Sequence, residues 1–312
     1  MRIIRDYQFV EMADKGASVA IGNFDGVHLG HQSVINIARE KAAEIEAPLG
    51  VVTFEPHPRN YFNPGKPTFR LMSADARATH LRKLGIDLLY QLNFNSALSE
   101  LSPKDFVQNV LYTGLDIKHV VVGADFKFGN NRRGTVDDLI NFGKKFDISV
   151  TISPLITANL GEVSSTSIRK SLSDGRPNDA ALQLGHWHRI EGTVVAGEQR
   201  GRKIGYPTTN MALDGLQLPK LGVYAVLVDV LEGPYIGNYR GVASLGVRPM
   251  FGTNSPNLET YIFDFSGDLY GKKLSIGLVE FLRPEEKYEG IDQLKVQIKK
   301  DCQKALSILE GI

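Results

Sequence analysis

The chain has 312 residues, and its 36 Lys and Arg against 35 Asp and Glu give a formal net charge of +1 at pH 7. Hydrophobic residues make up 42% and charged residues 23%, which excludes collagen-like, coiled-coil and disordered chains. The near-zero net charge argues against a protein whose main function is to bind nucleic acid. No apolar run approaches the roughly 18–20 residues of a membrane-spanning helix.

The beginning of the chain and its cysteine content bear on location. The first residues, MRIIRDYQFVEMADKG, contain acidic side chains where a signal peptide needs an unbroken apolar core. Cys302 is the only cysteine, so no intrachain disulfide can form. We therefore expect a cytoplasmic protein that does not associate with membranes. We expect a monomer or a weak homo-oligomer.

Between Ala17 and about Leu172, short apolar runs alternate with segments whose apolar residues are spaced three or four apart. The predicted strands are Ala17–Ile21, Leu49–Phe54, Ile86–Leu92, His119–Val122 and Ile148–Ile152. Strands separated by helices predict a parallel sheet covered on both faces. Such sheets bind ligands beyond the carboxyl ends of their strands, so the loop after each strand is a candidate site.

The second half has short apolar runs split by Gly, Pro, Asn and Asp. Its predicted strands lie around Val194 and at Val223–Val230, Tyr239–Leu245, Leu258–Phe265 and Leu274–Phe281. Close spacing without helices predicts an antiparallel barrel or sandwich. A final helix carries an apolar stripe that includes Cys302, which we interpret as a packing residue rather than a nucleophile. The prediction is an α/β domain at residues 1–184 and an all-β domain at residues 185–312 with a C-terminal helix.

The loop after the first predicted strand reads GNFDGVHLGH, from Gly22 to His31. Its glycines let the backbone approach a ligand, and a helix that opens near Gly30 points N–H groups at an anion. His28 and His31 add two imidazole donors. The HxGH pattern resembles the signature of the nucleotidyltransferase superfamily, whose histidines neutralise charge on the α-phosphate as pyrophosphate leaves. The alternative is a pair of capping or core histidines.

Three further loops follow predicted strands. The segment TFEPHP, residues 53–58, has two prolines that suit either a rigid flap or a structural turn. The segment GADFKFGNNRRG, residues 123–134, suits a clamp for ribose, ring and phosphate, or a solvated basic loop. The segment SSTSIR, residues 164–169, predicts a helix N-cap and an anion site, with Arg169 placed to reach a phosphate. Helix capping alone would also explain its serines.

In the second half, the glycine-rich cationic segment GEQRGRKIG leads into YPTTN, residues 206–210. Such backbone suits a polyphosphate, although a plain hairpin is the alternative. Thr208 and Asn210 share one face of an extended strand, and Mg²⁺ takes neutral oxygens such as theirs. Glu259 is a candidate general base if it does not lie at a wet barrel rim. Strict alternation places it on one face with Tyr261, Phe263 and Phe265. The segments 269–271 and 283–288 suit either a lid over a flat ring or ordinary loops.

Together, these motifs resemble the prokaryotic bifunctional riboflavin kinase/FAD synthetase family. The matching segments are GNFDGVHLGHQ, TFEPHP, GADFKFG, SSTSIR, GRKIGYPTTN, LGVYAV, LETYIFDF and DLYG, in family order from about residue 15 to about residue 309. The resemblance implies a Rossmann-like adenylyltransferase domain followed by a six-stranded antiparallel riboflavin-kinase barrel. It implies that ATP phosphorylates riboflavin to FMN, and that a second ATP adenylylates FMN to FAD with release of pyrophosphate. Mg²⁺ is the implied cofactor.

The resemblance also implies site residues. The catalytic residues would be His28, His31, Arg169 and Glu259. ATP in the adenylyltransferase site would contact Gly22, Phe24, Asp25, Gly26, His28, His31, Asp125, Ser164, Ser165, Thr166 and Arg169. The flavin there would contact Glu55, Pro56, His57, Pro58, Phe126 and Phe128. ATP and flavin in the kinase site would contact Gly201, Lys203, Gly205, Tyr206, Pro207, Thr208, Asn210, Glu259 and Arg283, with Thr208 and Asn210 on Mg²⁺ and Glu259 as the base.

Two residues of the segment 243–251 depart from the family pattern, which changes the contacts expected of this loop but not the catalytic residues. Ser244 stands where Asn is common, and Met250 where Thr is usual. Two other functions are possible from the residues alone. One is a nucleotidyltransferase for another phosphate, against which the kinase motifs argue. The other is a barrel that binds single-stranded nucleic acid, against which the even charge argues.

Overall fold

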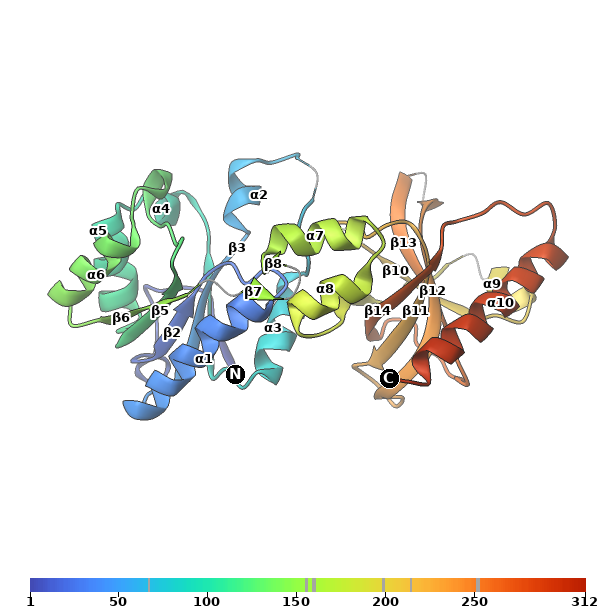
Figure 1. The fold of residues 1–312 in the computed structure, drawn as a ribbon. Coiled ribbons are helices and arrows are strands. Elements are labelled where there is room, and N and C mark those ends of the chain that lie inside the picture. The colour runs from blue at the N-terminus through green and yellow to red at the C-terminus, as the bar shows by residue number, and fades with distance from the viewer. Residues whose placement is uncertain (67, 155–156, 159–160, 198–199, 214, 251–252) are drawn as a thin grey trace. The chain divides into compact units, whose positions relative to one another are not determined.

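The computed structural model describes residues 1–66, 68–154, 157–158, 161–197, 200–213, 215–250 and 253–312 (Figure 1). The chain divides into two compact units, Met1–Pro67 with Arg77–Val163, and Thr68–Ala76 with Ser164–Ile312. We describe each unit by itself. The domain boundary after residue 184 stays a prediction.

The first unit is built on a six-stranded parallel sheet with the strand order β1-β4-β3-β2-β5-β6. The strands are β1 (Arg2–Ile4), β2 (Ser18–Ile21), β3 (Leu49–Glu55), β4 (Leu88–Asn93), β5 (His119–Gly123) and β6 (Ser149–Ser153). Central β-branched residues such as Val19, Val51 and Val120 are fully buried, as expected for a sheet that is covered on both faces. The predicted parallel α/β architecture is confirmed.

Helices connect these strands. They are α1 (Leu29–Glu44), α2 (Pro58–Phe62), α3 (Ala74–Lys83), α4 (Ser96–Ser99), α5 (Pro103–Asp105), a π-helix (Phe106–Gly114) and α6 (Val136–Lys145). The prediction omitted β1 and the hairpin of β7 (Thr157–Ala158) and β8 (Gly161–Glu162), because strands of two or three residues carry too little periodicity to be read. None of the helices in the described ranges is long and apolar enough to cross a membrane.

The strand order of the first unit identifies where a ligand can bind. β2 pairs with β3 on one side and with β5 on the other, so the chain changes direction across the sheet at this strand. In open parallel sheets the binding crevice lies at this point, beyond the carboxyl ends of the strands. The loops that begin at Gly22 and at Ala124 leave β2 and β5 at this edge.

The second unit holds a curled six-stranded antiparallel sheet with the order β10-β13-β12-β11-β14-β9. The strands are β9 (His188–Thr193), β10 (Thr208–Ala212), β11 (Gly222–Val230), β12 (Gly237–Met250), β13 (Thr253–Ile262) and β14 (Lys273–Arg283), and the helices are α7 (Ser165–Ser173), α8 (Pro177–Leu184), α9 (Arg200–Lys203) and α10 (Ile291–Leu309). Val195, just past β9, donates its backbone N–H to Asn210 O of β10 at 2.9 Å, which joins the outer strands. The predicted barrel is confirmed.

The two faces of this sheet pack differently. Residues such as Met211, Leu245 and Leu258 form the interior of the barrel. The other face packs against α10, which lies along β11 and β12 (Figure 1). Its cluster joins Val223 and Val242 of the sheet to Ala305 of the helix. Cys302, Ala305 and Leu309 of the predicted apolar stripe lie on this packing face, whereas its members Ile291 and Leu306 are exposed, at 61% and 37%.

Two details of the second half differ from the prediction. β12 continues through Met250 and forms a long hairpin with β13, so most of the expected loop at residues 243–251 is strand; Phe251 lies outside the described residues. β13 ends at Ile262, and Asp264 has a left-handed backbone with φ 51°. Because the alternation stops there, Phe265 packs into the barrel interior while Tyr261 and Phe263 pack on the α10 side. Placing Phe265 on the face of Glu259 was wrong.

Candidate functional sites

The loop after β2 ends in a histidine that caps a helix. α1 begins at Leu29, and His28 is its N-cap residue. The His28 Nδ1 atom accepts a hydrogen bond from the backbone N–H of His31 at 3.3 Å, and the two rings stack with centroids 3.7 Å apart. A neutral His28 that accepts at Nδ1 carries its proton on Nε2. The capping role is therefore real, and it orients the ring rather than excluding a ligand role.

His31 lies in the first turn of α1. Burial, followed by the charges of His28 and Arg77, holds the pKa of His31 well below its ordinary value. The ring is therefore neutral at pH 7, and its Nδ1 atom has no hydrogen-bond partner among the described residues. An anion placed against such a ring would accept its hydrogen bond and favour its protonated form.

The backbone of this loop is tightly bent. Phe24 has φ 51° and Val27 has φ 43°, although both carry side chains that disfavour left-handed backbone. Both side chains are almost fully buried, at 1% and 0% exposure, and Asp25 between them is 4% exposed. Packing therefore holds the strained turn in place, as is common at binding sites.

A residue that the sequence did not single out connects the strand ends around this loop. Arg77 of α3 is only 1% exposed. Its guanidinium donates to Asn23 O at 3.0 Å, to a Glu55 carboxylate oxygen at 3.2 Å and to Gln91 Oε1 at 3.5 Å. These partners lie after β2, at the end of β3 and on β4. No spacing in the polar helix ADARATHLRK distinguishes a buried arginine from an exposed one.

The expected flavin contacts of the first unit occupy two loops. The Glu55-Pro56 peptide bond is cis, and His57 caps the short helix α2 at Pro58 by accepting from Arg59 N at 3.1 Å. Phe126 and Phe128 stack with ring centroids 5.7 Å apart and an interplanar angle of 12°. Phe128 packs in the core at 6% exposure, Phe126 is half-buried, and Asp125 is exposed. Their ligand roles stay predictions.

The SSTSIR segment belongs to the second unit. The Ser164 hydroxyl accepts a hydrogen bond from Ser167 N at 3.2 Å and caps α7, and Ser164 N in turn donates to the Ser167 hydroxyl. The predicted helix cap is therefore confirmed. Ser165 is half-buried and Thr166 is exposed in the first turn. Arg169 donates Nε to Phe69 O at 2.6 Å, and its guanidinium lies 5.1 Å from the centre of the Phe69 ring. The segment after residue 67 therefore orients Arg169.

The sheet of the second unit gathers polar side chains on the face of Thr208 and Asn210. Asn210 pairs with Glu259, and Glu259 also pairs with Ser244 of β12. Asn257 donates Nδ2 to Asn210 Oδ1 at 2.9 Å and lies 3.4 Å from Glu259 Oε1. The face therefore holds the neutral side-chain oxygens of Thr208 and Asn210 beside one carboxylate. Asn257 was missed because its role depends on the strand register.

The glycine-rich segment packs its backbone against these residues. A Cβ atom at Gly197 would lie 2.4 Å from Asn210 Nδ2, and one at Gly201 would lie 2.3 Å from Tyr206 O. Tyr206 N donates to Gly201 O at 2.9 Å, and Gly205 in this turn has φ 91°. After Pro207 the chain enters β10. Residues 198 and 199 and the side chain of Lys203, an expected contact of the kinase site, lie outside the described residues.

Two hollows of the second unit share the lining residue Ser244. The smaller is lined by Ser244, Gly246, Asn257 and Glu259. The larger, of about 420 Å³, is lined by Val223, Ser244, Arg283, Glu285, Glu286, Tyr288, Glu289, Gly290, Ile291 and Leu294. Ser244 lines both. The departure at Ser244 therefore lies beside the expected base, and most of the segment expected to form a lid, 283–288, lines the larger cavity.

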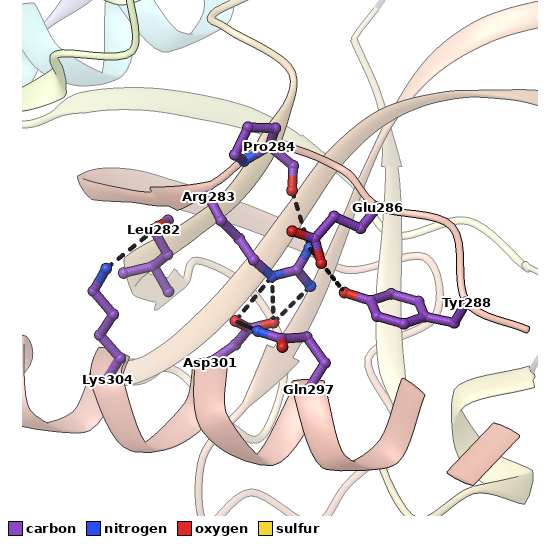
Figure 2. A network of polar contacts seen from close by, with 8 residues as sticks. All are labelled: Leu282, Arg283, Pro284, Glu286, Tyr288, Gln297, Asp301 and Lys304. Atoms are coloured by element: carbon purple, nitrogen blue, oxygen red, sulfur yellow. Dashed lines mark hydrogen bonds and ion pairs between the residues drawn. The ribbon is translucent and has the colours of Figure 1, made fainter. Parts of the chain in front are cut away.

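Figure 2 shows how Arg283 joins this cavity wall to α10. Its guanidinium donates to both carboxylate oxygens of Asp301, at 2.7, 3.0 and 3.1 Å, and to Pro284 O at 3.0 Å. Burial opposes the charge of Arg283, yet the hydrogen bond to Asp301 and its charge raise the pKa of Arg283. Cys302 packs beside Asp301, and burial, helped by that charge, raises the pKa of its thiol to about 11. The thiol stays protonated at pH 7, in line with a packing role.

The described residues contain no group of three or more His, Cys, Asp or Glu side chains that could hold a metal ion. The expected Mg²⁺ ligands are of another kind, because Thr208 and Asn210 offer neutral oxygens. Asn257 Oδ1 is buried and has no hydrogen-bond partner among the described residues, and together with the close backbone of Gly197 it makes this a polar pocket that fits a small hydrated cation.

Comparison with known proteins identifies both halves. A family model described as FAD synthetase matches residues 10–167, and one described as riboflavin kinase matches residues 184–309. Relatives named bifunctional riboflavin kinase/FMN adenylyltransferase include those of Listeria monocytogenes, 38% identical over 94% of this chain and 92% of its own, and Haemophilus influenzae, 36% identical over 98% of both.

A solved structure has the same fold over nearly the whole chain. It is titled a macrolide-efflux protein from Streptococcus pneumoniae and matches with a TM-score of 0.82 and 32% identity over 96% of both chains. The family models and the curated relatives agree on the two transferase activities. The chain belongs to the family of bifunctional riboflavin kinase/FMN adenylyltransferases.

Proposed function

We propose that the chain makes FMN in the second unit, at the face of Thr208, Asn210 and Glu259, and makes FAD with the residues of the GNFDGVHLGH loop. Membership of the family makes riboflavin, FMN and ATP its substrates and FAD its product. The observation that supports the kinase assignment is that Ser244, which pairs with Glu259 between β12 and β13, also lines a cavity of about 420 Å³.

In the kinase step, Glu259 takes the proton from the 5′-hydroxyl of riboflavin in the larger cavity. The hydroxyl oxygen attacks the γ-phosphorus of ATP, a new P–O bond forms, and the bond to the β-phosphate oxygen breaks to release ADP. Thr208 and Asn210 would hold Mg²⁺, which when bound neutralises phosphate charge. The remaining work of the protein is positioning, as in phosphoryl transfer generally. Gly201, Gly205, Tyr206 and Pro207 shape the backbone on the ATP side, and Arg283 holds the cavity wall.

In the adenylyltransferase step, the FMN phosphate is already ionised at pH 7 and needs no general base. Its oxygen attacks the α-phosphorus of ATP, and pyrophosphate leaves. His28 and His31 would donate hydrogen bonds to the charge that develops on the α-phosphate. Gly22, Phe24, Asp25 and Gly26 hold the backbone that presents them. We retain Ser164, Ser165, Thr166, Arg169 and Asp125 as proposed ATP contacts, and Glu55, Pro56, His57, Pro58, Phe126 and Phe128 as proposed flavin contacts, on the strength of the family pattern.

The test incubates the purified chain with riboflavin and MgATP and separates FMN from FAD. We expect both products from the wild-type chain. Loss of one donor to a developing negative charge commonly costs about 3–4 kcal/mol, so His28→Ala should lower FAD formation by at least a hundredfold while FMN formation continues. Glu259→Ala should abolish FMN formation but still convert supplied FMN to FAD. If either variant, although folded, lost both reactions, the assignment to two separate sites would be wrong.

Several broader assignments are also proposals. The boundary after residue 184 is supported by the start of the riboflavin-kinase match at residue 184. We propose a cytoplasmic protein, since its relatives are bacterial enzymes that use ATP, and one that does not act on nucleic acid. We also propose a monomer or weak homo-oligomer, which sedimentation at two protein concentrations tests.

A further inference from the structure

Asn257 lies between the two side chains of the second unit to which the kinase chemistry is assigned, Asn210 and Glu259. It lies on β13 two residues before Glu259, on the same face, and is 3% exposed. We propose that Asn257 is a positioning residue of the kinase site, whose side-chain amide holds Asn210 and Glu259 in one fixed arrangement. This inference rests on the proposed function of that site.

The first argument is the hydrogen bonding. A primary amide has two N–H donors on one nitrogen. Asn257 Nδ2 lies 2.9 Å from Asn210 Oδ1 and 3.4 Å from Glu259 Oε1. One side chain therefore reaches both the proposed metal ligand and the proposed base. Removing its nitrogen would loosen both at once.

The second argument concerns the orientation of Asn210. The two ends of the Asn210 amide have nearly the same shape, and only their hydrogen bonds distinguish the oxygen from the nitrogen. A neighbouring N–H donor therefore holds the oxygen on its own side. Asn257 supplies that donor, and the backbone of Gly197 fills the space beside Asn210 Nδ2, where a Cβ would come within 2.4 Å. The carbonyl oxygen has a second lone pair, which is left for a cation.

The third argument is the energetic penalty that Asn257 carries. Its Oδ1 atom is buried and has no hydrogen-bond partner among the described residues. A buried amide that satisfies only its nitrogen is a poor choice for stability alone. The strands do not need it as a tie, because β10 and β13 already pair over five residues from Thr208 to Ala212. The site therefore gains something from Asn257 that the fold does not.

The experiment compares the full-length wild-type chain with Asn257→Leu, which keeps the size but removes both polar atoms. Residues that hydrogen-bond to metal ligands typically change metal affinity or activity roughly 10–100-fold when substituted. We expect a change of that size in the kinase kcat and in the Mg²⁺ concentration for half-maximal rate. FAD formation from supplied FMN and the midpoint of unfolding should stay near the wild-type values. Asn257→Ser, which keeps a hydroxyl donor, should be intermediate.

Asn238→Leu is the control for loss of an amide donor, because Asn238, which is exposed on the same sheet, also donates Nδ2 to a carboxylate, Asp229, at 2.9 Å. It should leave both kinase parameters unchanged. The proposal is overturned if Asn257→Leu keeps kcat and the Mg²⁺ requirement within twofold of wild type. It is also overturned if kinase activity falls only in proportion to the fraction of unfolded protein. If Asn257→Leu does not fold, the same two criteria are applied to Asn257→Ser. If the wild-type chain does not phosphorylate riboflavin at all, the proposed function itself fails.

Discussion

Replacing Arg283 by Met tests whether the ion pair in Figure 2 is an energetic centre of the second unit. The side chains of Arg283 and Asp301 are only 16% and 8% exposed, so the pair is largely shielded from water. Removing one partner of a buried pair leaves an uncompensated charge and costs about 3–5 kcal/mol. After Arg283→Met, Asp301 would keep only the bond from Gln297 Nε2 at 2.9 Å among those described. We therefore expect a loss near 3 kcal/mol.

A double-mutant cycle separates this loss from a packing defect. Asp301→Leu alone should cost about 2–3 kcal/mol, because the Arg283 charge then loses its partner. The double variant Arg283→Met/Asp301→Leu replaces both charges by apolar groups, which is often close to neutral, so it should lose less than either single variant. The free energy of unfolding is measured in urea by the fluorescence of Trp187, the single tryptophan, which packs in the cluster under α10. A loss under about 1 kcal/mol for Arg283→Met, or strictly additive effects, would refute this reasoning.

Two further predictions concern a buried histidine and Arg77. Burial, and then the charge of His186, lowers the pKa of His188 to about 3 from an ordinary 6.5. As the pH falls, His188 binds a proton in the unfolded chain before it does so in the folded one. The free energy of unfolding that is present above pH 6.5 is therefore lost on acidification, by about 2 kcal/mol between pH 7 and 5. Urea unfolding followed by Trp187 fluorescence at several pH values measures this loss. His188→Gln should flatten the dependence of the free energy of unfolding on pH, and a dependence equal to that of the wild type would contradict the prediction. Arg77→Met should lower FAD formation at least tenfold, since Asn23 and Glu55 lose a shared donor. Product analysis checks this, and an equal loss of FMN formation would show a general folding defect instead.

Much of the fold could be predicted because the relevant signals are local. An unbroken apolar run such as Leu49–Phe54 marks a buried strand wherever it pairs, and the hydroxyl run at Ser164 marks a helix start by its own hydrogen bonds. The same holds for the polar face of β10, where alternation alone places Thr208 with Asn210. Local geometry is set by neighbours in the chain, and sequence patterns contain those neighbours.

By itself, then, the sequence determined the two fold classes, the order of the motifs and the chemistry that their residue types suit. Only the tertiary structure decided which side chains meet. Arg77 contacts Asn23 across 54 residues, and Asn257 contacts Asn210 across 47. The end of β13 at Ile262 likewise turned Phe265 away from Glu259. Such contacts depend on strand order, register and burial, which are properties of the whole packed chain and which no local pattern of residues records.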